Sequence, residues 1–180
     1  MERIVIDGSR ASQVIDRIRT LLRKGEPEMK ALNLNEVIRE TLMLTRSELA
    51  LHQVSTLTEL SEDLPHVVGD RVQLQQVLVN LMLNGADAMS VMADGPRRLT
   101  LRSRTDGNGG ILVQVEDTGV GLAADSAERI FEAFFTTKPS GLGMGLSISR
   151  SIIEAHGGKL WATANDDRGA TLHFSMPAVS

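Results

Sequence analysis

A polar stripe on an otherwise apolar helix is the feature that most constrains how this chain can fold. Between Val72 and Met92, apolar residues recur at helical spacing, which predicts a helix that begins at about Asp70. Within it, polar residues at i, i+4, i+8 and i+11 share one face: Gln76, Asn80, Asn84 and Asp87. An unpaired buried amide costs roughly 1–3 kcal/mol, so this face needs partners. The stripe therefore predicts a polar site beside the core.

Length and composition limit the classes to which the chain can belong. Its 180 residues fit one domain, or one domain with a short appendage, and 42% hydrophobic content allows a packed core. It has no cysteines, which excludes disulfides and thiolate metal sites. The net charge of −4 argues against nucleic-acid binding, so local groups must hold any anionic ligand. No apolar run is long enough to span a membrane, and Met1–Arg10 lacks a secretory pattern. We expect a cytoplasmic location, in a parent protein that upstream segments can attach to a membrane.

The rest of the chain divides into helical and alternating segments. A glycine-rich turn at 106–110 joins two alternating segments and predicts a β-hairpin. Helices on one side of a mixed, largely antiparallel sheet give an α+β fold, a two-layer α/β sandwich. The expected helices are Asp7–Lys24, Leu34–Gln53 with Asn33 or Asn35 as its cap, Ser126–Phe131 and Leu146–His156. The expected strands are Thr56–Leu60, Leu99–Arg104, Ile111–Glu116, Lys159–Ala164 and Thr171–Met176.

The first helix, Asp7–Lys24, precedes the domain proper and has a narrow apolar face. This pattern favours a coiled-coil or bundle partner, although docking on its own domain remains an alternative. Because water penalises a bare apolar stripe, we expect a weak homodimer through Asp7–Lys24 or such docking. The face consists of Ala11, Val14, Ile15, Ile18, Leu21 and Leu22.

Two glycine-containing segments follow the striped helix. Asp117 comes just after a strand and can accept a hydrogen bond from an exocyclic amine such as adenine N6, while Gly119 and Gly121 allow close backbone approach. An ordinary Asp-Thr-Gly turn is the alternative for this segment alone. The second segment, Pro139–Leu146, leads into a helix whose first N–H groups favour phosphate oxygens. It matches neither a P-loop nor a Rossmann turn, and a glycine hinge is its alternative.

Asn84 completes this set of candidate ligand-binding groups. Its side-chain oxygen is a hard ligand and suits a Mg²⁺ ion whose other ligands are mainly phosphate oxygens and water. A hydrogen-bonded core amide is the alternative for a single asparagine. The order of the stripe and the two glycine turns favours a site for a metal-bound nucleotide.

These segments resemble, in chain order, the motifs of sensor histidine kinases, catalytic domains of the GHKL ATPase/kinase superfamily. The resemblance covers about Leu32 to Met176, and Asp7–Lys24 resembles the second helix of the dimerisation and histidine-phosphotransfer hairpin. The matching segments are Gln76–Ala88 with the N box, Asp117–Gly121 with the first glycine box, Ile130–Lys138 with the F box, Gly141–Leu146 with the second glycine box and Gly169–Phe174 with the last.

The resemblance implies a Bergerat-type ATP-binding fold and a set of residue roles. Asn84 would hold Mg²⁺ with Asn80 beside it, and Thr171 would support the adenine contact of Asp117 through water. Lys138 would reach the terminal phosphates from a mobile lid spanning about 134–144. The implied catalytic residues are Asn80, Asn84 and Lys138, and the implied nucleotide-binding residues are Asn84, Asp87, Asp117, Gly119, Gly121, Lys138, Gly141, Leu142, Gly143, Met144, Gly145, Leu146 and Thr171.

The resemblance also implies a division of the chain and a reaction. Residues 1–27 would be the partial hairpin and 28–180 the kinase domain, which transfers the γ-phosphoryl group of ATP to a histidine for onward signalling to a response regulator. ATPase branches carry a catalytic Glu where this chain has Asn80, which favours transfer to histidine over activation of water. A non-catalytic, nucleotide-responsive module of the same fold is the second hypothesis, and an ATPase the third.

No histidine of this chain has the context expected of a phosphoacceptor. We expect structural or solvated roles for all 4 of them, namely His52, His66, His156 and His173. The acceptor helix is therefore expected upstream or in another chain. ATP and ADP, the acceptor helix and a response regulator are the expected partners.

Overall fold

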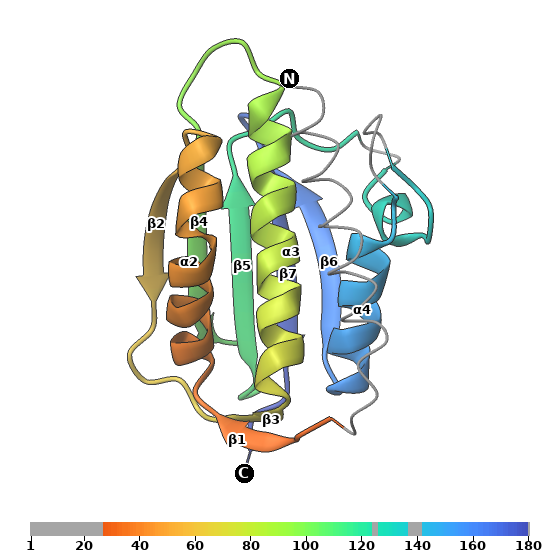
Figure 1. Ribbon diagram of the computed structural model, residues 1–180. Helices are drawn as coiled ribbons and strands as arrows, with labels where there is room; N and C mark the ends of the chain where they lie inside the picture. The colour runs from red at the N-terminus through yellow and green to blue at the C-terminus, as the bar shows by residue number, and fades with distance from the viewer. Residues whose placement is uncertain (1–26, 124–125, 137–141, 180) are drawn as a thin grey trace, which may run out of the picture.

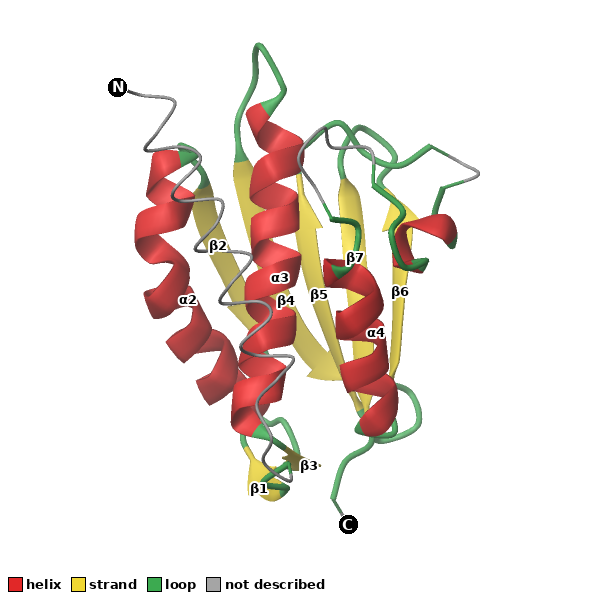
Figure 2. Ribbon diagram, turned by 45° about the vertical axis from the view of Figure 1, so that its right-hand side comes forward, coloured by secondary structure: helices red, strands yellow, loops and turns green. Residues whose placement is uncertain are grey.

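A five-stranded sheet with helices packed on one face forms the body of the protein (Figures 1 and 2). The computed structural model describes residues 27–123, 126–136 and 142–179. This is the predicted α+β two-layer fold. The helices are α2 (Leu34–Leu51), α3 (Arg71–Ser90), α4 (Gly145–Ala155) and the 3₁₀ helix η1 (Arg129–Phe131). The strands are β1 (Lys30–Leu32), β2 (Ser55–Leu60), β3 (Val67–Gly69), β4 (Arg98–Thr105), β5 (Ile111–Asp117), β6 (Lys159–Ala164) and β7 (Ala170–Met176).

The sheet has the order β2-β4-β5-β7-β6, in which only β2 and β4 pair in parallel. The predicted hairpin joins β4 and β5. Asp106 closes it, because its carboxylate accepts hydrogen bonds from the N–H groups of Asn108 and Gly110 at 2.8 and 2.7 Å. The register pairs Leu99 with Asp117, which places that carboxylate at the end of the strand and beside α3.

Side-chain caps define where α2 and α3 begin. Asn33 accepts a hydrogen bond from the N–H of Asn35, and Asp70 accepts one from the N–H of Gln73, both at 3.0 Å. Asn33 is therefore the cap, one of the two predicted alternatives. Burial opposes ionisation of Asp70, but hydrogen bonds from backbone N–H groups, that of Gln73 foremost, outweigh it and lower its pKa. The cap of α3 is thus charged at neutral pH.

The core lies between α3 and the sheet. Leucines and a methionine on the apolar face of α3 are fully buried against Leu99, Leu101 and Val113 of the central strands. Burying one such side chain contributes roughly 1.5–3 kcal/mol, so α3 is fixed to the sheet along its whole length. The α3 residues concerned are Leu74, Leu78, Leu81 and Met82.

The structure differs from the sequence-based expectation in several elements, and one predicted helix is not tested. Strands β1 and β3 form a small two-stranded sheet that was not predicted, because three residues are too few to show alternation. The predicted helix Ser126–Phe131 is helical only at Arg129–Phe131. Helix α4 begins at Gly145 and ends at Ala155, one residue earlier at each end than predicted. Asp7–Lys24 lies outside the described residues.

Three of the four histidines are built into the packing and His66 is exposed, so both expected kinds of position, structural and solvated, occur. His156 caps α4, with Nδ1 2.7 Å from the carbonyl oxygen of Ile152, and its Nε2 accepts a hydrogen bond from the N–H of Asp70 at 3.0 Å. His173 stacks on Trp161, and burial, aided by Arg104, lowers its pKa. His52 caps α2 next to Glu48.

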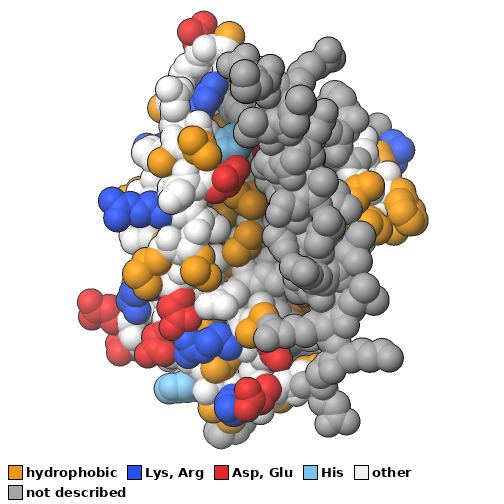
Figure 3. All heavy atoms as spheres, in the orientation of Figure 1, with side chains coloured by type: hydrophobic (Ala, Val, Ile, Leu, Met, Phe, Trp, Pro, Cys, Tyr) orange, Lys and Arg blue, Asp and Glu red, His pale blue; other side chains and the backbone are white. Residues whose placement is uncertain are grey.

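Two surface properties concern the setting of the domain. In the part of the chain that the structure describes, no helix has the length and apolar content needed to cross a membrane. Acidic and basic side chains intermingle on the face in Figure 3. Arg71 pairs with Glu36 and Glu40.

Candidate functional site

The polar stripe of α3 leads to a cavity of about 360 Å³ at the carboxyl end of β5. The walls come from the last two turns of α3, the turn after β5, the segment around η1, the first turn of α4 and the start of β7. Asn84 and Asp87 contribute polar groups from α3, and Asp117 contributes a carboxylate from β5. The complete lining is Asn84, Gly85, Asp87, Ala88, Val91, Asp117, Val120, Gly121, Leu122, Ile130, Leu146, Ala170 and Leu172.

Asp117 is the charged group at the base of this cavity, with 6% of its surface exposed. Its Oδ1 accepts a hydrogen bond from the N–H of Gly119 at 2.8 Å, and the carboxylate also accepts one from the N–H of Ala170. Burial raises its pKa despite these two bonds, and the negative charge of Glu116 raises it further. A ligand amine that donates to this carboxylate would relieve part of the burial penalty.

Gly119 allows the turn after β5 to lie directly against α3. A Cβ atom at this position would lie 2.7 Å from the backbone carbon and 2.8 Å from the carbonyl oxygen of Ala88. That oxygen accepts a hydrogen bond from the N–H of Val120 at 3.2 Å. The first glycine box thus fixes the turn to the helix and holds Val120 and Gly121 at the cavity wall.

Asn80 contacts the start of α4 and is not among the residues that line the cavity. Its Nδ2 donates a hydrogen bond to Oγ of the buried Ser149 at 3.0 Å. A Cβ atom on Gly145 would lie 2.4 Å from its Oδ1, so glycine is needed for this approach. Asn80 therefore joins α3 to the first turns of α4, and Leu146 of the second glycine box reaches the cavity.

The other residues of the second glycine box are only partly placed. The carbonyl oxygen of Gly143 accepts a hydrogen bond from the N–H of Phe134 at 2.9 Å, and Met144 is the cap residue of α4. Leu142 is 44% exposed and does not line the cavity. Lys138 and Gly141 lie outside the described residues, as does the middle of the predicted lid. Their assigned roles stay predictions.

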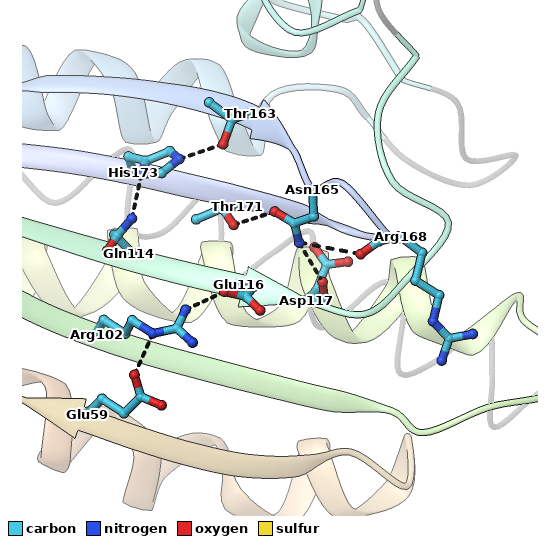
Figure 4. Close-up of polar contacts among 10 residues, drawn as sticks. All are labelled: Glu59, Arg102, Gln114, Glu116, Asp117, Thr163, Asn165, Arg168, Thr171 and His173. Atoms are coloured by element: carbon cyan, nitrogen blue, oxygen red, sulfur yellow. Dashed lines mark hydrogen bonds and ion pairs between the residues drawn. The ribbon is translucent and has the colours of Figure 1, made fainter.

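Thr171, which the resemblance gives a role in supporting Asp117 through water, does not line the cavity. Side chains alternate along a strand, so Ala170 and Leu172 face the cavity and Thr171 faces the opposite side of the sheet. There its hydroxyl donates a hydrogen bond to Oδ1 of Asn165 at 2.7 Å (Figure 4). Thr171 therefore connects to Asp117 through Asn165, and its indirect support of the adenine contact stays a prediction.

Of the apolar side chains in the cavity wall, only Leu146 was predicted from the sequence. Two more members of this wall could have been found by continuing the helical spacing from Asn84 to i+4 and i+7, which gives Ala88 and Val91. The other apolar residues could be assigned to the cavity only once it was known which face of a strand, or which side of a turn, points toward it. These residues are Val120, Leu122, Ile130, Ala170 and Leu172.

The donor set for a metal is small. The described residues contain no group of three or more His, Cys, Asp or Glu side chains that could hold a metal ion. Asn84 lines the cavity and supplies an amide oxygen, which fits a Mg²⁺ ion that receives its other ligands from phosphates and water. The residues present thus fit a nucleotide-bound ion and not a cage made by the protein alone.

Comparison with known proteins identifies the family. Residues 69–180 match the model of the histidine kinase-, DNA gyrase B- and HSP90-like ATPase family. Because this match covers more than half of the chain, the protein belongs to that family. This confirms the family predicted from the motifs.

Individual relatives point in the same direction. The chain is 41% identical over 180 residues to the sensor protein FixL of Bradyrhizobium diazoefficiens, covering 99% of this chain but only 35% of that protein. The histidine kinase ThkA, solved with the response regulator TrrA, matches 98% of this chain and 49% of its own with a TM-score of 0.77 and 31% identity. Full-length ShkA, solved with AMPPNP, matches 87% of this chain and 32% of its own with a TM-score of 0.75 and 26% identity. The chain thus spans about a third of the length of its curated relative FixL.

Gly169 gives a direct test of the geometry around Asp117. It has φ of +87°, and a Cβ atom there would lie 1.9 Å from the carbonyl oxygen of Asp117. We expect Gly169→Ala to lower the free energy of unfolding by about 2 kcal/mol or more, measured by urea denaturation. Gly107→Ala is the matched control, because a Cβ there meets no atom within 4 Å. Equal stability of the two variants would contradict the close contact.

Proposed function

We propose that this chain is the ATP-binding catalytic domain of a two-component sensor histidine kinase, and that it transfers the γ-phosphoryl group of Mg·ATP to a histidine on an acceptor helix. The observation that carries the proposal is the buried carboxylate of Asp117 at the base of a cavity with apolar walls. Such a carboxylate can read the exocyclic amine of adenine while the apolar walls hold the ring.

The two ends of the nucleotide would lie at different parts of the cavity. The base would lie against Asp117, Ala88 and Val120, where the wall is apolar apart from the carboxylate. The phosphates would extend toward Asn84 and the N-terminal end of α4, whose first N–H groups favour anionic oxygens. Gly143, Met144 and Gly145 lie at that end of α4, and Lys138 is proposed to reach the same phosphates.

Asn84 is proposed to hold Mg²⁺ through its side-chain oxygen. When bound, this ion would neutralise charge on the phosphates during transfer. The protein's own contribution is to orient the nucleotide. Asp117 would fix the base, and Asn84, near the end of α3, would fix the position of the phosphates. Asp87 lines the same wall one turn further along α3.

Transfer to a histidine is favoured over hydrolysis and over a non-catalytic role. Asn80 has no carboxylate with which to activate water, and its amide is engaged with Ser149. FixL is a sensor protein and ThkA a histidine kinase by name, which favours catalysis over the non-catalytic module. The buried positions of His156 and His173 favour an acceptor other than these two histidines.

Partners and domain division follow from the same proposal. ThkA was solved with a response regulator, and we propose a response regulator as the downstream partner of this chain. Residues 28–180 are proposed as the kinase domain, supported by the hydrogen bond from the N–H of Glu28 to Asp70 at 2.8 Å and by β1, which follows directly. Residues 1–27 are proposed as part of the phosphotransfer hairpin, with a cytoplasmic location for the whole.

The test combines binding with transfer. We expect ADP to bind in titration calorimetry, and labelled ATP with Mg²⁺ to label a separately made hairpin that carries the acceptor histidine of the parent kinase. The chain alone should remain unlabelled. Release of free phosphate without a labelled hairpin would favour an ATPase, and ADP binding without either product would favour the non-catalytic module. Acid-labile label on the chain itself would show that one of its histidines is an acceptor, with His52 the first to examine.

A further inference from the structure

We infer that Asn165 is a positioning residue that holds Asp117 in the orientation needed to read the nucleotide base, and that Thr171 fixes the amide of Asn165 for this purpose. The inference rests on the proposed nucleotide-binding function and extends it to residues outside the cavity. Neither Asn165 nor Thr171 lines the cavity, so each acts on a ligand only through Asp117.

Asn165 begins the turn between β6 and β7 and reaches across to the end of β5 (Figure 4). Its backbone N–H donates to the carbonyl oxygen of Gly169 at 3.1 Å, which closes the turn. Its side-chain Nδ2 donates to the carbonyl oxygen of Asp117 at 3.2 Å and to that of Arg168 at 3.4 Å. One side chain thus joins the turn to the strand that carries the carboxylate.

The position of Asp117 explains why this bond matters. The last residue pair between β5 and β7 is Glu116 with Thr171, so Asp117 stands one residue beyond the pairing with β7, although it still pairs with Leu99 of β4 on its other side. Asn165 supplies a side-chain hydrogen bond to the carbonyl oxygen at this point. Two residues after Asp117, the N–H of Gly119 donates a hydrogen bond of 2.8 Å to Oδ1 of the Asp117 carboxylate. The peptide bond that follows Asp117 therefore lies between its carbonyl oxygen and this donor. Rotation of that peptide would therefore turn the carboxylate itself.

Thr171 determines which way the Asn165 amide points. Its Oγ1–H donates to Oδ1 of Asn165 at 2.7 Å, and this leaves Nδ2 directed at Asp117. Without the hydroxyl, the amide could turn and place Oδ1 opposite the carbonyl oxygen of Asp117, where two acceptors repel each other. Thr171 is buried with 6% of its surface exposed, so water would replace the lost donor poorly.

The experiment compares two ligands on the full chain by titration calorimetry: ADP, and the diphosphate of purine riboside, which lacks the 6-amino group. We expect Asn165→Ala to weaken ADP binding by about three- to tenfold and to leave the analogue almost unchanged, since only ADP uses the orientation of Asp117. Thr171→Val should also weaken ADP binding more than binding of the analogue. Thr171→Ser, which keeps the hydroxyl group, should retain the wild-type preference for ADP. Asp166→Ala is the control, an exposed residue of the same turn.

The outcomes separate this inference from the proposed function. Equal weakening of both ligands by Asn165→Ala would show a general structural role and overturn the inference. So would an unchanged preference for ADP in both Asn165→Ala and Thr171→Val. If the wild-type chain itself binds the two ligands equally, base recognition by Asp117 is wrong, and this result is visible before any variant is made.

Discussion

Replacing Asp117 with asparagine should weaken ADP binding by about tenfold to a hundredfold and at the same time raise the Tm of the ligand-free chain. A hydrogen bond to a charged group contributes roughly 1.5–3 kcal/mol, and the variant loses this charge. The NH₂ group of the asparagine side chain could also face the exocyclic amine of the base, where two donors cannot form a hydrogen bond. The side chain keeps its shape and its oxygen can still accept the hydrogen bond from Gly119, so the fold should be preserved although the bond from Ala170 is weakened. Stability rises because a buried charge is removed.

The pH dependence gives this prediction a second readout. The pKa of Asp117 is raised in the folded chain by burial, so folding favours the protonated carboxyl group. The cost that the ionised Asp117 imposes on the folded state is absent below its unfolded pKa of about 3.9. This cost is complete above its raised pKa in the folded chain. The stability advantage of Asp117→Asn should therefore grow as pH rises through this window. ADP binding to the wild type should weaken as pH falls through the folded pKa.

Thermal melts and calorimetry on the same samples would measure both effects, with Asp167→Asn as the control for loss of an exposed carboxylate. Unchanged ADP affinity in the Asp117 variant would remove this residue from the base site. Lower stability at neutral pH would show that the carboxylate is better paired in the fold than its burial indicates.

The framework of the fold could be predicted from local patterns. The cap of α2 at Asn33 or Asn35, the start of α3 near Asp70, the turn at 106–110 and the alternation of β4 and β5 each involve residues close in sequence, and all were predicted. Strands β1 and β3 could not be found in this way. Each has three residues, and they exist because Lys30 pairs with Gly69, which lies far along the chain.

The candidate site shows the same limit. Asn84 and Asp117 were found from motif order, and the structure brings both to one cavity. Thr171 was predicted from the motif as an indirect support of Asp117, but the pleat decides which neighbours face the cavity, and these are Ala170 and Leu172. Asn165 was missed altogether. Its contact with Asp117 spans 48 residues and depends on how β6 and β7 return beside β5.

Replacing Asn84 with alanine should lower Mg²⁺-dependent phosphoryl transfer by about a hundredfold or more while the domain stays folded. Phosphoryl transfer depends mainly on positioning and on neutralising charge, and Asn84 is the group proposed to hold the ion that does so. The side chain lies at the cavity wall and not in the apolar core, so its loss removes little packing. Asn108→Ala, in the exposed turn of the β4–β5 hairpin, is the matched control.

The assay follows labelling of a separately made acceptor hairpin across a MgCl₂ titration, and calorimetry measures ADP affinity with and without Mg²⁺. If Asn84 holds the ion, the variant should bind metal-free ADP like the wild type but lose the gain in affinity that Mg²⁺ gives. Full transfer by the variant would exclude Asn84 as the metal ligand. Equal loss of ADP affinity with and without Mg²⁺ would instead assign Asn84 to a direct contact with the nucleotide, because a residue that acts only through the ion cannot alter binding in its absence.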